Sequence, residues 1–323
     1  MKIGFYDDFK PCILKDDGVV DISAQVGHLD EGDPQLYMER IIGDFDSLRP
    51  ALEQAAASGA VTPLGQVRLR PPLPRPGKVL CGEGNFKEGV DVDPPKPLRT
   101  FFKSPDAVIG NGDTVVLPTF RPVIFNHEAE LGVVIGREAK RVSPDDALNY
   151  VFGYTTTVDV SARAPEADEA EVPGTPPSHY DKSFDTFLPM GPAITTADEV
   201  ADPNNLQIKY FVNGKLRQDY NTSDMEAGIA NMIATLSHVM TLKPGDLIMG
   251  GTNHGNLGPL QDGDFGEVEI EGLGRQGHNI VDSMKRTWDP DALRDPALNA
   301  ANREAQKGQA NTGSWPFQAP YNP

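Results

Sequence analysis

The sequence predicts an α+β fold that consists mostly of β-strands, and three observations support this prediction. Short apolar runs of strand length recur along residues 77–285, and most are bounded by glycine, proline or asparagine. Apolar residues with helical spacing are concentrated at 36–56 and 229–240. A proline-rich joint at 71–77 separates the N-terminal part from the rest, because prolines stiffen the chain and remove hydrogen-bond donors.

These features divide the chain into three parts. We expect a small α+β domain at residues 1–70 and a larger domain at 77–285. Residues 286–323 are rich in Asn, Ala, Gly and Pro and show no sustained period, so they predict a C-terminal extension.

Within these parts, turn and cap residues predict the boundaries of single elements. Asn111-Gly112 and Asn213-Gly214 each predict a hairpin, because Asn-Gly suits the positive φ angles of a type I′ turn. Ser223 and Glu226 have the spacing of a capping box, which predicts that a helix begins there.

Composition and charge exclude several classes of function. The net charge is −18 over 323 residues, so little Lys or Arg is available to bind nucleic acid or an anionic membrane. No run approaches the ~20 apolar residues of a membrane span. Cys12 and Cys81 lie far apart, which argues against a disulfide framework or a thiolate zinc site. We expect a cytoplasmic protein with buried free thiols.

Two glutamates lie in a strand-like run at 126–136. Glu128 and Glu130 alternate with Ala129, so in a strand their side chains share one face, roughly 6.5–7 Å apart along the chain. Taken alone, this pattern also fits the solvated face of an antiparallel strand. Asp159 ends another buried run, where a carboxylate needs a compensating partner. Three such oxygen ligands suit Mg²⁺ or Mn²⁺.

The same pattern occurs once more without a predicted function. Glu267, Glu269 and Glu271 alternate with Val268 and Ile270, and we expect them to be solvated.

Two further residues have side chains suited to an anionic ligand. Lys182 by itself reads as a surface charge. Thr252 follows Gly250-Gly251, where a strand runs into a glycine-rich loop whose amides and hydroxyl could meet a carboxylate.

The chain resembles the fumarylacetoacetate hydrolase family in a series of blocks between residue 77 and about residue 280. The blocks are His127-Glu128-Ala129-Glu130-Leu131, Tyr150-Val151-Phe152-Gly153-Tyr154-Thr155, Asp159-Val160-Ser161-Ala162-Arg163, Lys182-Ser183-Phe184-Asp185-Thr186-Phe187, Val212-Asn213-Gly214 with Gln218, and the stretch that ends in Gly250-Gly251-Thr252.

The resemblance implies a mixed β-roll-like catalytic domain, a homodimer and a divalent metal, Mg²⁺ or Mn²⁺. The matching metal ligands are Glu128, Glu130 and Asp159. The residues implied to bind a 2-oxo acid substrate are Arg163, Lys182, Gln218, Gly251 and Thr252. Members of the family hydrolyse, decarboxylate, isomerise or dehydrate 2-oxo acids, so the fold indicates the substrate head group better than the reaction.

One departure from the family concerns water activation. Hydrolases of the family carry a His and a Glu on the loop after the first strand of the catalytic domain, where this chain has Gly89 and Val92. The candidate bases that the sequence leaves open are Glu83, Glu88, His179, His254 and a metal-bound hydroxide. We take Glu88, with Lys182 and Thr252, as the predicted catalytic residues.

The leading hypothesis is a metal-dependent hydrolase of an acylpyruvate-type 2,4-dioxo acid, such as fumarylpyruvate or maleylpyruvate from aromatic-compound catabolism. The alternative is a 2-oxo acid decarboxylase, a keto-enol isomerase or a 2-keto-3-deoxy acid dehydratase, because the usual dyad is absent. A third hypothesis is a non-catalytic protein that binds a metal and an oxo acid.

Overall fold

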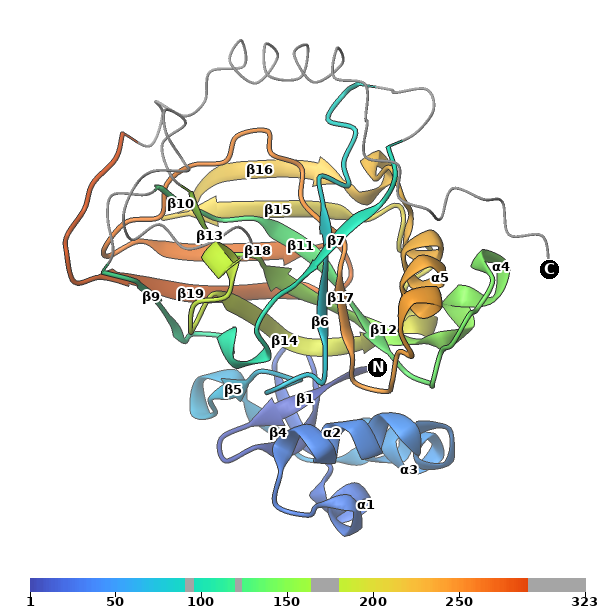
Figure 1. Ribbon diagram of the computed structural model, residues 1–323. Helices are drawn as coiled ribbons and strands as arrows, with labels where there is room; N and C mark the ends of the chain where they lie inside the picture. Colours follow the sequence, from blue (N-terminus) through green and yellow to red (C-terminus); the bar gives the residue numbers. More distant parts are fainter. Residues whose placement is uncertain (91–95, 120–123, 164–179, 290–323) are drawn as a thin grey trace.

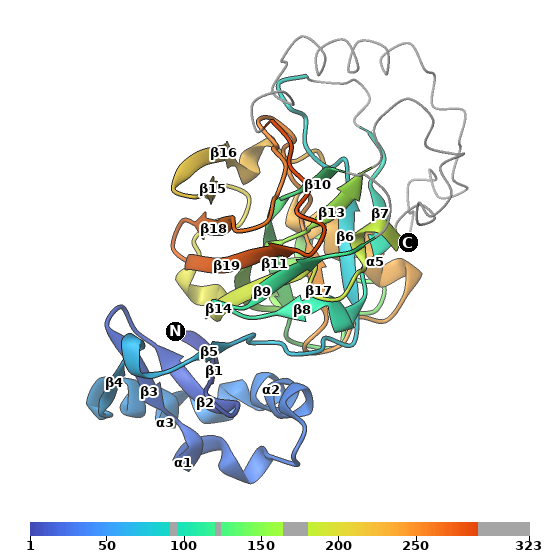
Figure 2. The ribbon, with the colours of Figure 1, turned by 90° about the vertical axis from the view of Figure 1, so that its left-hand side faces the viewer.

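The computed structural model describes residues 1–90, 96–119, 124–163 and 180–289 (Figure 1). Strands predominate, as predicted, and most belong to two sheets that pack face to face (Figures 1 and 2). Within these residues no helix is long and apolar enough to cross a membrane. Cys12 and Cys81 are buried free thiols, as expected.

The larger sheet runs through the whole molecule. Its path is β4 (Val61–Pro63), β3 (Gly18–Asp21), β2 (Lys10–Leu14), β1 (Lys2–Tyr6), β14 (Leu188–Thr196), β12 (Val151–Val158), β11 (Ala129–Ile135), β17 (Leu247–Met249), β6 (Val79–Glu83) and β7 (Arg99–Phe102). Off this path, β5 (Leu69–Arg70) pairs with β1, and β8 (Val108–Ile109) pairs with β14. The central strands β11, β12 and β14 are buried along their whole length.

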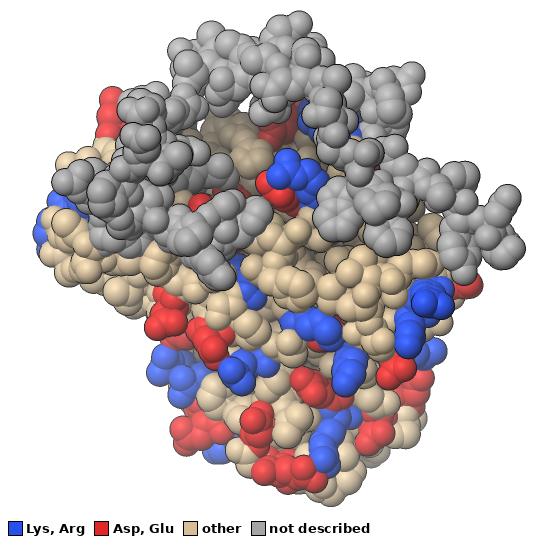
Figure 3. Space-filling model, in the orientation of Figure 1, with Lys and Arg blue, Asp and Glu red and all other residues tan. Residues whose placement is uncertain are grey.

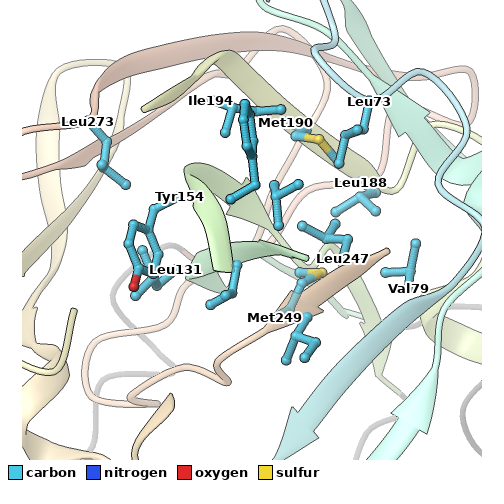
Figure 4. Close-up of a cluster of buried hydrophobic side chains, with 14 of the residues drawn as sticks. Leu73, Val79, Leu131, Tyr154, Leu188, Met190, Ile194, Leu247, Met249 and Leu273 are labelled. Atoms are coloured by element: carbon cyan, nitrogen blue, oxygen red, sulfur yellow. The ribbon is translucent and has the colours of Figure 1, made fainter. Parts of the chain in front are cut away.

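The second sheet covers one face of these central strands. Its order is β16 (Lys215–Asn221), β15 (Gln207–Val212), β18 (Phe265–Ile270), β19 (Gly274–Asp282) and β9 (Thr114–Leu117), and a separate pair is formed by β10 (Ile124–Asn126) and β13 (Ser161–Arg163). Apolar side chains of β11, β12, β14 and β17 belong to one buried cluster, in which Leu131 lies beside Tyr154 and Met249 beside Leu247 (Figure 4). This packing holds β11 and β12 rigidly in the middle of the fold.

The N-terminal elements extend the larger sheet. β1 pairs antiparallel with β14, with Ile3 opposite Ile194. The helices α1 (Ser23–Val26), α2 (Pro34–Gly43) and α3 (Phe45–Ser58) lie beside these strands, and the predicted helical stretch at 36–56 is confirmed (Figure 1). Acidic and basic side chains are interspersed over the lower part of the face in Figure 3. The domain boundary at the proline-rich joint stays a prediction.

Only one of the two hairpins predicted at Asn-Gly is present. Asn213 and Gly214 have φ angles of 51° and 74°, and they join β15 to β16 as predicted. The hairpin predicted at Asn111-Gly112 is wrong. Gly112 does turn the chain, with φ 81°, but β8 before it pairs with β14 and β9 after it pairs with β19. The strands on either side of the turn belong to different sheets.

The predicted capping box is also wrong. The helix α5 (Ile229–Val239) begins after Gly228, and the Oδ1 of Asn204 accepts a hydrogen bond of 2.9 Å from the Ile229 amide. A 3-10 helix occupies Thr222–Asp224, and the amides of Glu226 and Ala227 are bound by Asn85 where the chain bends before α5. The helix α4 (Pro144–Ala147), which contacts α5, is capped by the Ser143 side chain.

Candidate active site

Three carboxylates meet where β11 begins and β12 ends. Glu130 lies in β11, Glu128 precedes this strand, and Asp159 directly follows β12. The two strands pair with Ala129 opposite Val158, and the Asp159 amide donates a 2.8 Å hydrogen bond to the Glu128 carbonyl. One carboxylate oxygen from each residue lies within 4.8 Å of the others. The convergence predicted from the sequence is therefore present.

The strand-like run at 126–136 is interrupted at the site itself. β10 ends at Asn126 and β11 begins at Ala129, so His127 and Glu128 lie between two strands. All three carboxylates are buried, with exposed fractions of 3% for Glu128 and 1% for both Glu130 and Asp159. The alternating glutamates of β18 have a different environment. Glu267 and Glu269 lie at the surface beside Arg275, which bridges both.

Lys182 bridges two of the carboxylates. Its Nζ lies 2.8 Å from Oε2 of Glu128 and 2.7 Å from Oδ2 of Asp159, and it also donates to the Ser161 hydroxyl at 2.5 Å. The side chain is 12% exposed. A lysine that reads as a surface charge in the sequence is thus brought into the carboxylate cluster.

A second ammonium group, that of Lys103, was missed by sequence reasoning. Its side chain is fully buried, and its Nζ donates to Oδ1 of Asp159 at 2.6 Å. It also donates to the carbonyls of Val160 and Lys182. A single lysine between Phe102 and Ser104 gives no periodic signal, so only the tertiary structure shows its partners.

The cluster has an excess of negative charge that fits a cation. Three carboxylates face two ammonium groups, which leaves one negative charge when all five groups are ionised. Burial, and then the charges of Asp159 and Glu128, raise the pKa of Glu130 well above its usual value. A divalent cation would relieve both effects, and buried carboxylate oxygens are the ligands that Mg²⁺ and Mn²⁺ prefer. Cys81 is not expected to be a ligand, since burial, and then Asp159 and Glu130, raise the pKa of its thiol.

A glycine-rich loop closes the cluster on the side of Glu130. The Gly251 amide donates to Oε2 of Glu130 at 2.8 Å, and the Thr252 hydroxyl donates to the Ala129 carbonyl at 3.0 Å. Gln218 lies next to this loop, and its Nε2 donates to the Thr252 hydroxyl and to the Asn253 carbonyl. The loop, β11 and β16 are therefore fixed relative to one another.

Both the oxygen and the nitrogen of the Gln218 side-chain amide form hydrogen bonds within the protein. Its Oε1 lies 3.0 Å from Nδ1 of His127 and accepts from the Ala129 amide at 3.2 Å. Burial lowers the pKa of His127 to about 4, so the imidazole is neutral near pH 7. These contacts support Thr252 through Gln218, and the predicted contact of Gln218 with a substrate stays a prediction.

Gly251 is expected to tolerate no side chain. Its φ is 86°, and a Cβ atom would lie 3.2 Å from both the Gly82 carbonyl oxygen and Cβ of Asn85. Gly263 is a matched control, because its φ is 81° and a Cβ atom there would meet nothing within 4 Å. We expect Gly263→Ala to lose about 1 kcal/mol of unfolding free energy through backbone strain alone. Gly251→Ala should lose clearly more in the same urea titration, and equal losses would contradict the steric reason.

The structure places the candidate bases in different environments. Oε1 of Glu88 accepts from the His254 amide at 2.8 Å and lies 2.6 Å from Nδ1 of the same residue. Glu83 instead pairs with Arg99 at 2.8 Å. His179 lies outside the described residues, as does the side chain of Arg163 at the end of β13.

The comparison with protein families agrees with this geometry. Residues 79–281 match the model described as fumarylacetoacetate (FAA) hydrolase C-terminal. The chain belongs to the fumarylacetoacetate hydrolase family. The resemblance predicted from the sequence blocks is thereby confirmed, and the fumarylacetoacetate hydrolase domain comprises the carboxylate cluster, both lysines and the glycine-rich loop.

Within the fumarylacetoacetate hydrolase family, two solved structures and two characterised relatives are informative. The crystal structure of maleylpyruvate hydrolase from Sphingobium sp. SYK-6 is 36% identical with a TM-score of 0.77, over 88% of this chain and 100% of that chain. The same enzyme in complex with manganese(II) and pyruvate gives the same identity and score, over 87% and 99%.

Two relatives that are similar in sequence are named for a different activity, the tautomerisation of oxaloacetate. Oxaloacetate tautomerase Fahd2a, mitochondrial, from Rattus norvegicus is 34% identical over 266 residues, which cover 80% of this chain and 82% of the relative. Oxaloacetate tautomerase YisK from Bacillus subtilis is 35% identical over 229 residues, which cover 67% and 74%. The chain is thus a member of an enzyme family whose named activities include both hydrolysis and tautomerisation.

Proposed function

We propose that this protein is a divalent-metal-dependent hydrolase that cleaves the C3–C4 bond of an acylpyruvate-type 2,4-dioxo acid, such as maleylpyruvate or fumarylpyruvate. The observation that carries the proposal is the buried cluster of three carboxylates with Lys182 bridging two of them. A 2-oxo acid offers a carboxylate and an adjacent carbonyl, which is the head group that such a cluster with a hard cation suits.

Each residue of the site has a separate role in this proposal. Glu128, Glu130 and Asp159 would hold Mg²⁺ or Mn²⁺, which supplies Lewis acidity at the C2 carbonyl. Lys182 places a positive charge where negative charge develops as the C3–C4 bond breaks, and removing one such stabiliser often costs about 3 kcal/mol. Gly251, Thr252 and Arg163 are proposed to receive the substrate carboxylate.

The relative from Sphingobium supports the substrate class. Its structure contains manganese and pyruvate, and pyruvate is the product that retains the head group when an acylpyruvate is hydrolysed. The 36% identity extends over 87% of this chain, so the likeness is not confined to the metal site. The homodimer, the cytoplasmic location and a role in aromatic-compound catabolism stay predictions.

A second candidate is tautomerisation of a 2-oxo acid such as oxaloacetate. Gly89 occupies the position of the histidine with which family hydrolases activate water, and tautomerisation needs only proton transfers at C3 and oxygen. The two tautomerase relatives favour this candidate at 34% and 35% identity.

Metal removal distinguishes catalysis from binding. With Mg²⁺ or Mn²⁺ present, we expect the protein to release pyruvate from maleylpyruvate or fumarylpyruvate, and EDTA should abolish this release because it removes the Lewis acid at the C2 carbonyl. Coupled lactate dehydrogenase measures the pyruvate, and the enol absorbance of oxaloacetate measures tautomerisation in parallel. Enol loss without pyruvate release from any acylpyruvate would favour the second candidate.

A further inference from the structure

A carboxylate–imidazole pair joins two segments that are distant in the sequence. Glu88 lies on the segment after β6, and His254 lies on the glycine-rich loop after β17. Both the backbone amide and Nδ1 of His254 contact the same oxygen of Glu88, at 2.8 and 2.6 Å. The contact to the backbone amide fixes the loop, and the contact to Nδ1 fixes the imidazole ring.

The pair lies close to the carboxylate cluster along the chain. His254 follows Gly251 by three residues, and the Gly251 amide binds Glu130. Three residues of chain span at most ~11 Å, so the backbone of His254 lies within this distance of the Gly251 backbone that binds Glu130. The intervening Asn253 is held on both sides, because its carbonyl accepts from Gln218 and its side chain donates to Asp224.

Asp224 holds the two segments together. Its Oδ2 accepts from the Glu88 amide and from the Asn253 side chain, each at 3.0 Å, and its carbonyl accepts from the Lys87 amide. Glu88 itself has a φ of 53°, a conformation that a non-glycine residue adopts only when its surroundings impose it. The placement of Glu88 against His254 is thus enforced by its neighbours.

The geometry suits a general base. When Nδ1–H donates to a carboxylate, the neutral imidazole carries its lone pair on Nε2, and the carboxylate stabilises the imidazolium that forms on proton uptake. The His254 side chain is 35% exposed, so water can reach it, whereas that of Glu88 is 14% exposed.

We propose that Glu88 and His254 form the water-activating pair of this protein, with His254 as the base and Glu88 as the group that orients it. The pair takes the place of the histidine and glutamate that family hydrolases carry where this chain has Gly89 and Val92. This inference rests on the proposed hydrolase function and adds the residues that complete it.

The proposed step begins with addition of water to the C4 carbonyl. Nε2 of His254 accepts a proton from water while the water oxygen bonds to C4, and the C4 carbonyl becomes an alkoxide. The alkoxide re-forms the carbonyl as the C3–C4 bond breaks, and the electron pair passes to the enolate of pyruvate. The imidazolium then returns its proton to C3, so that one water and one acylpyruvate give one carboxylic acid and one pyruvate.

Two conservative variants test the pair. His254→Asn keeps a donor near Glu88 but has no Nε2, and Glu88→Gln keeps an acceptor for the His254 amide but has no charge. We expect kcat for pyruvate release to fall ~10²–10⁴-fold in His254→Asn and at least ~10-fold in Glu88→Gln. Exchange of the C3 protons of pyruvate in D2O should slow in parallel, while KM and Mn²⁺ affinity should stay near the wild-type values.

Matched controls are available elsewhere in the chain. His238→Asn alters a histidine on α5 whose Nδ1 lies 2.8 Å from the Ala234 carbonyl of the same helix, and Glu269→Gln alters a surface carboxylate beside Arg275. Both controls should keep kcat and the exchange rate. Full kcat and full exchange in His254→Asn would overturn the pair and would leave the hydrolase proposal intact.

The two proposals fail in different ways. A wild-type protein that exchanges C3 protons but releases no pyruvate from any acylpyruvate contradicts hydrolysis, and the exchange rates of the variants still decide the role of the pair. A wild-type protein that does neither, with Mn²⁺ present, overturns both.

Discussion

Replacing Glu130 by glutamine is expected to stabilise the metal-free protein and to abolish its response to metal. The carboxylate is 1% exposed and lies near two other carboxylates, and burial with these charges raises its pKa well above 4.5. A raised pKa in the folded state means that stability is fully present below pH 4.5 and is lost as the pH rises through the folded value, at up to ~1.4 kcal/mol per pH unit. Glutamine keeps an acceptor for the Gly251 amide without the charge.

Thermal unfolding at several pH values, with EDTA or with Mg²⁺, measures this effect. In EDTA, the melting temperature of Glu130→Gln should exceed that of the wild type, and the difference should widen from pH 5 to pH 8. Mg²⁺ should raise the melting temperature of the wild type alone, because ligand binding to the folded state stabilises it. We also expect pyruvate release to fall at least ~100-fold in the variant.

Glu269→Gln is the matched control, since it removes a carboxylate at the surface that pairs with Arg275. It should change neither the pH dependence nor the metal response appreciably. A Glu130→Gln variant that Mg²⁺ stabilises as much as the wild type would show that Glu130 is not a metal ligand.

Replacing Lys103 by methionine is expected to cause the largest loss of stability. Its ammonium group is fully buried and binds Asp159 and two backbone carbonyls, so the variant leaves a buried carboxylate and two carbonyls without this donor. Breaking a buried pair by removing one partner typically costs about 3–5 kcal/mol.

Lys182→Met separates stability from chemistry. Lys182 is 12% exposed and shares its carboxylates with other groups, so we expect a smaller loss of unfolding free energy and a larger loss of kcat, ~10²–10³-fold. Urea denaturation in EDTA and steady-state kinetics with Mn²⁺ measure the two effects. If Lys103→Met unfolds at the wild-type urea concentration, the buried pair contributes little to stability.

Local sequence patterns predicted the elements that depend on local contacts. The hairpin at Asn213-Gly214 formed because both residues accept a positive φ and the flanking strands pair with each other. The same dipeptide at Asn111-Gly112 also turns the chain, but sheet membership is decided by partners that are distant in the sequence. Likewise, the α-helix predicted from Ser223 begins only after Gly228, where Asn204 from a distant segment binds the Ile229 amide.

In the candidate site, too, the sequence predicted what depends on local geometry and missed what depends on distant contacts. Strand geometry predicted that Glu128 and Glu130 point the same way, and Asp159 could be added from its buried context. Glu128 lies just before β11 instead of within it, but its carboxylate still reaches the cluster. Lys103 could not be found, because its role depends on a carboxylate 56 residues away. The contact of Glu88 with His254 could not be found either, although both were candidate bases, because it joins two loops across 166 residues.

The double role of Lys103 couples two predicted functional groups of the candidate site. One ammonium group binds Oδ1 of Asp159 and the backbone carbonyl of Lys182, and the ammonium group of Lys182 binds Oδ2 of the same Asp159. Any displacement of Lys103 therefore moves a predicted metal ligand and the predicted catalytic lysine at the same time. The spacing between these two groups is set from behind the site by one buried side chain.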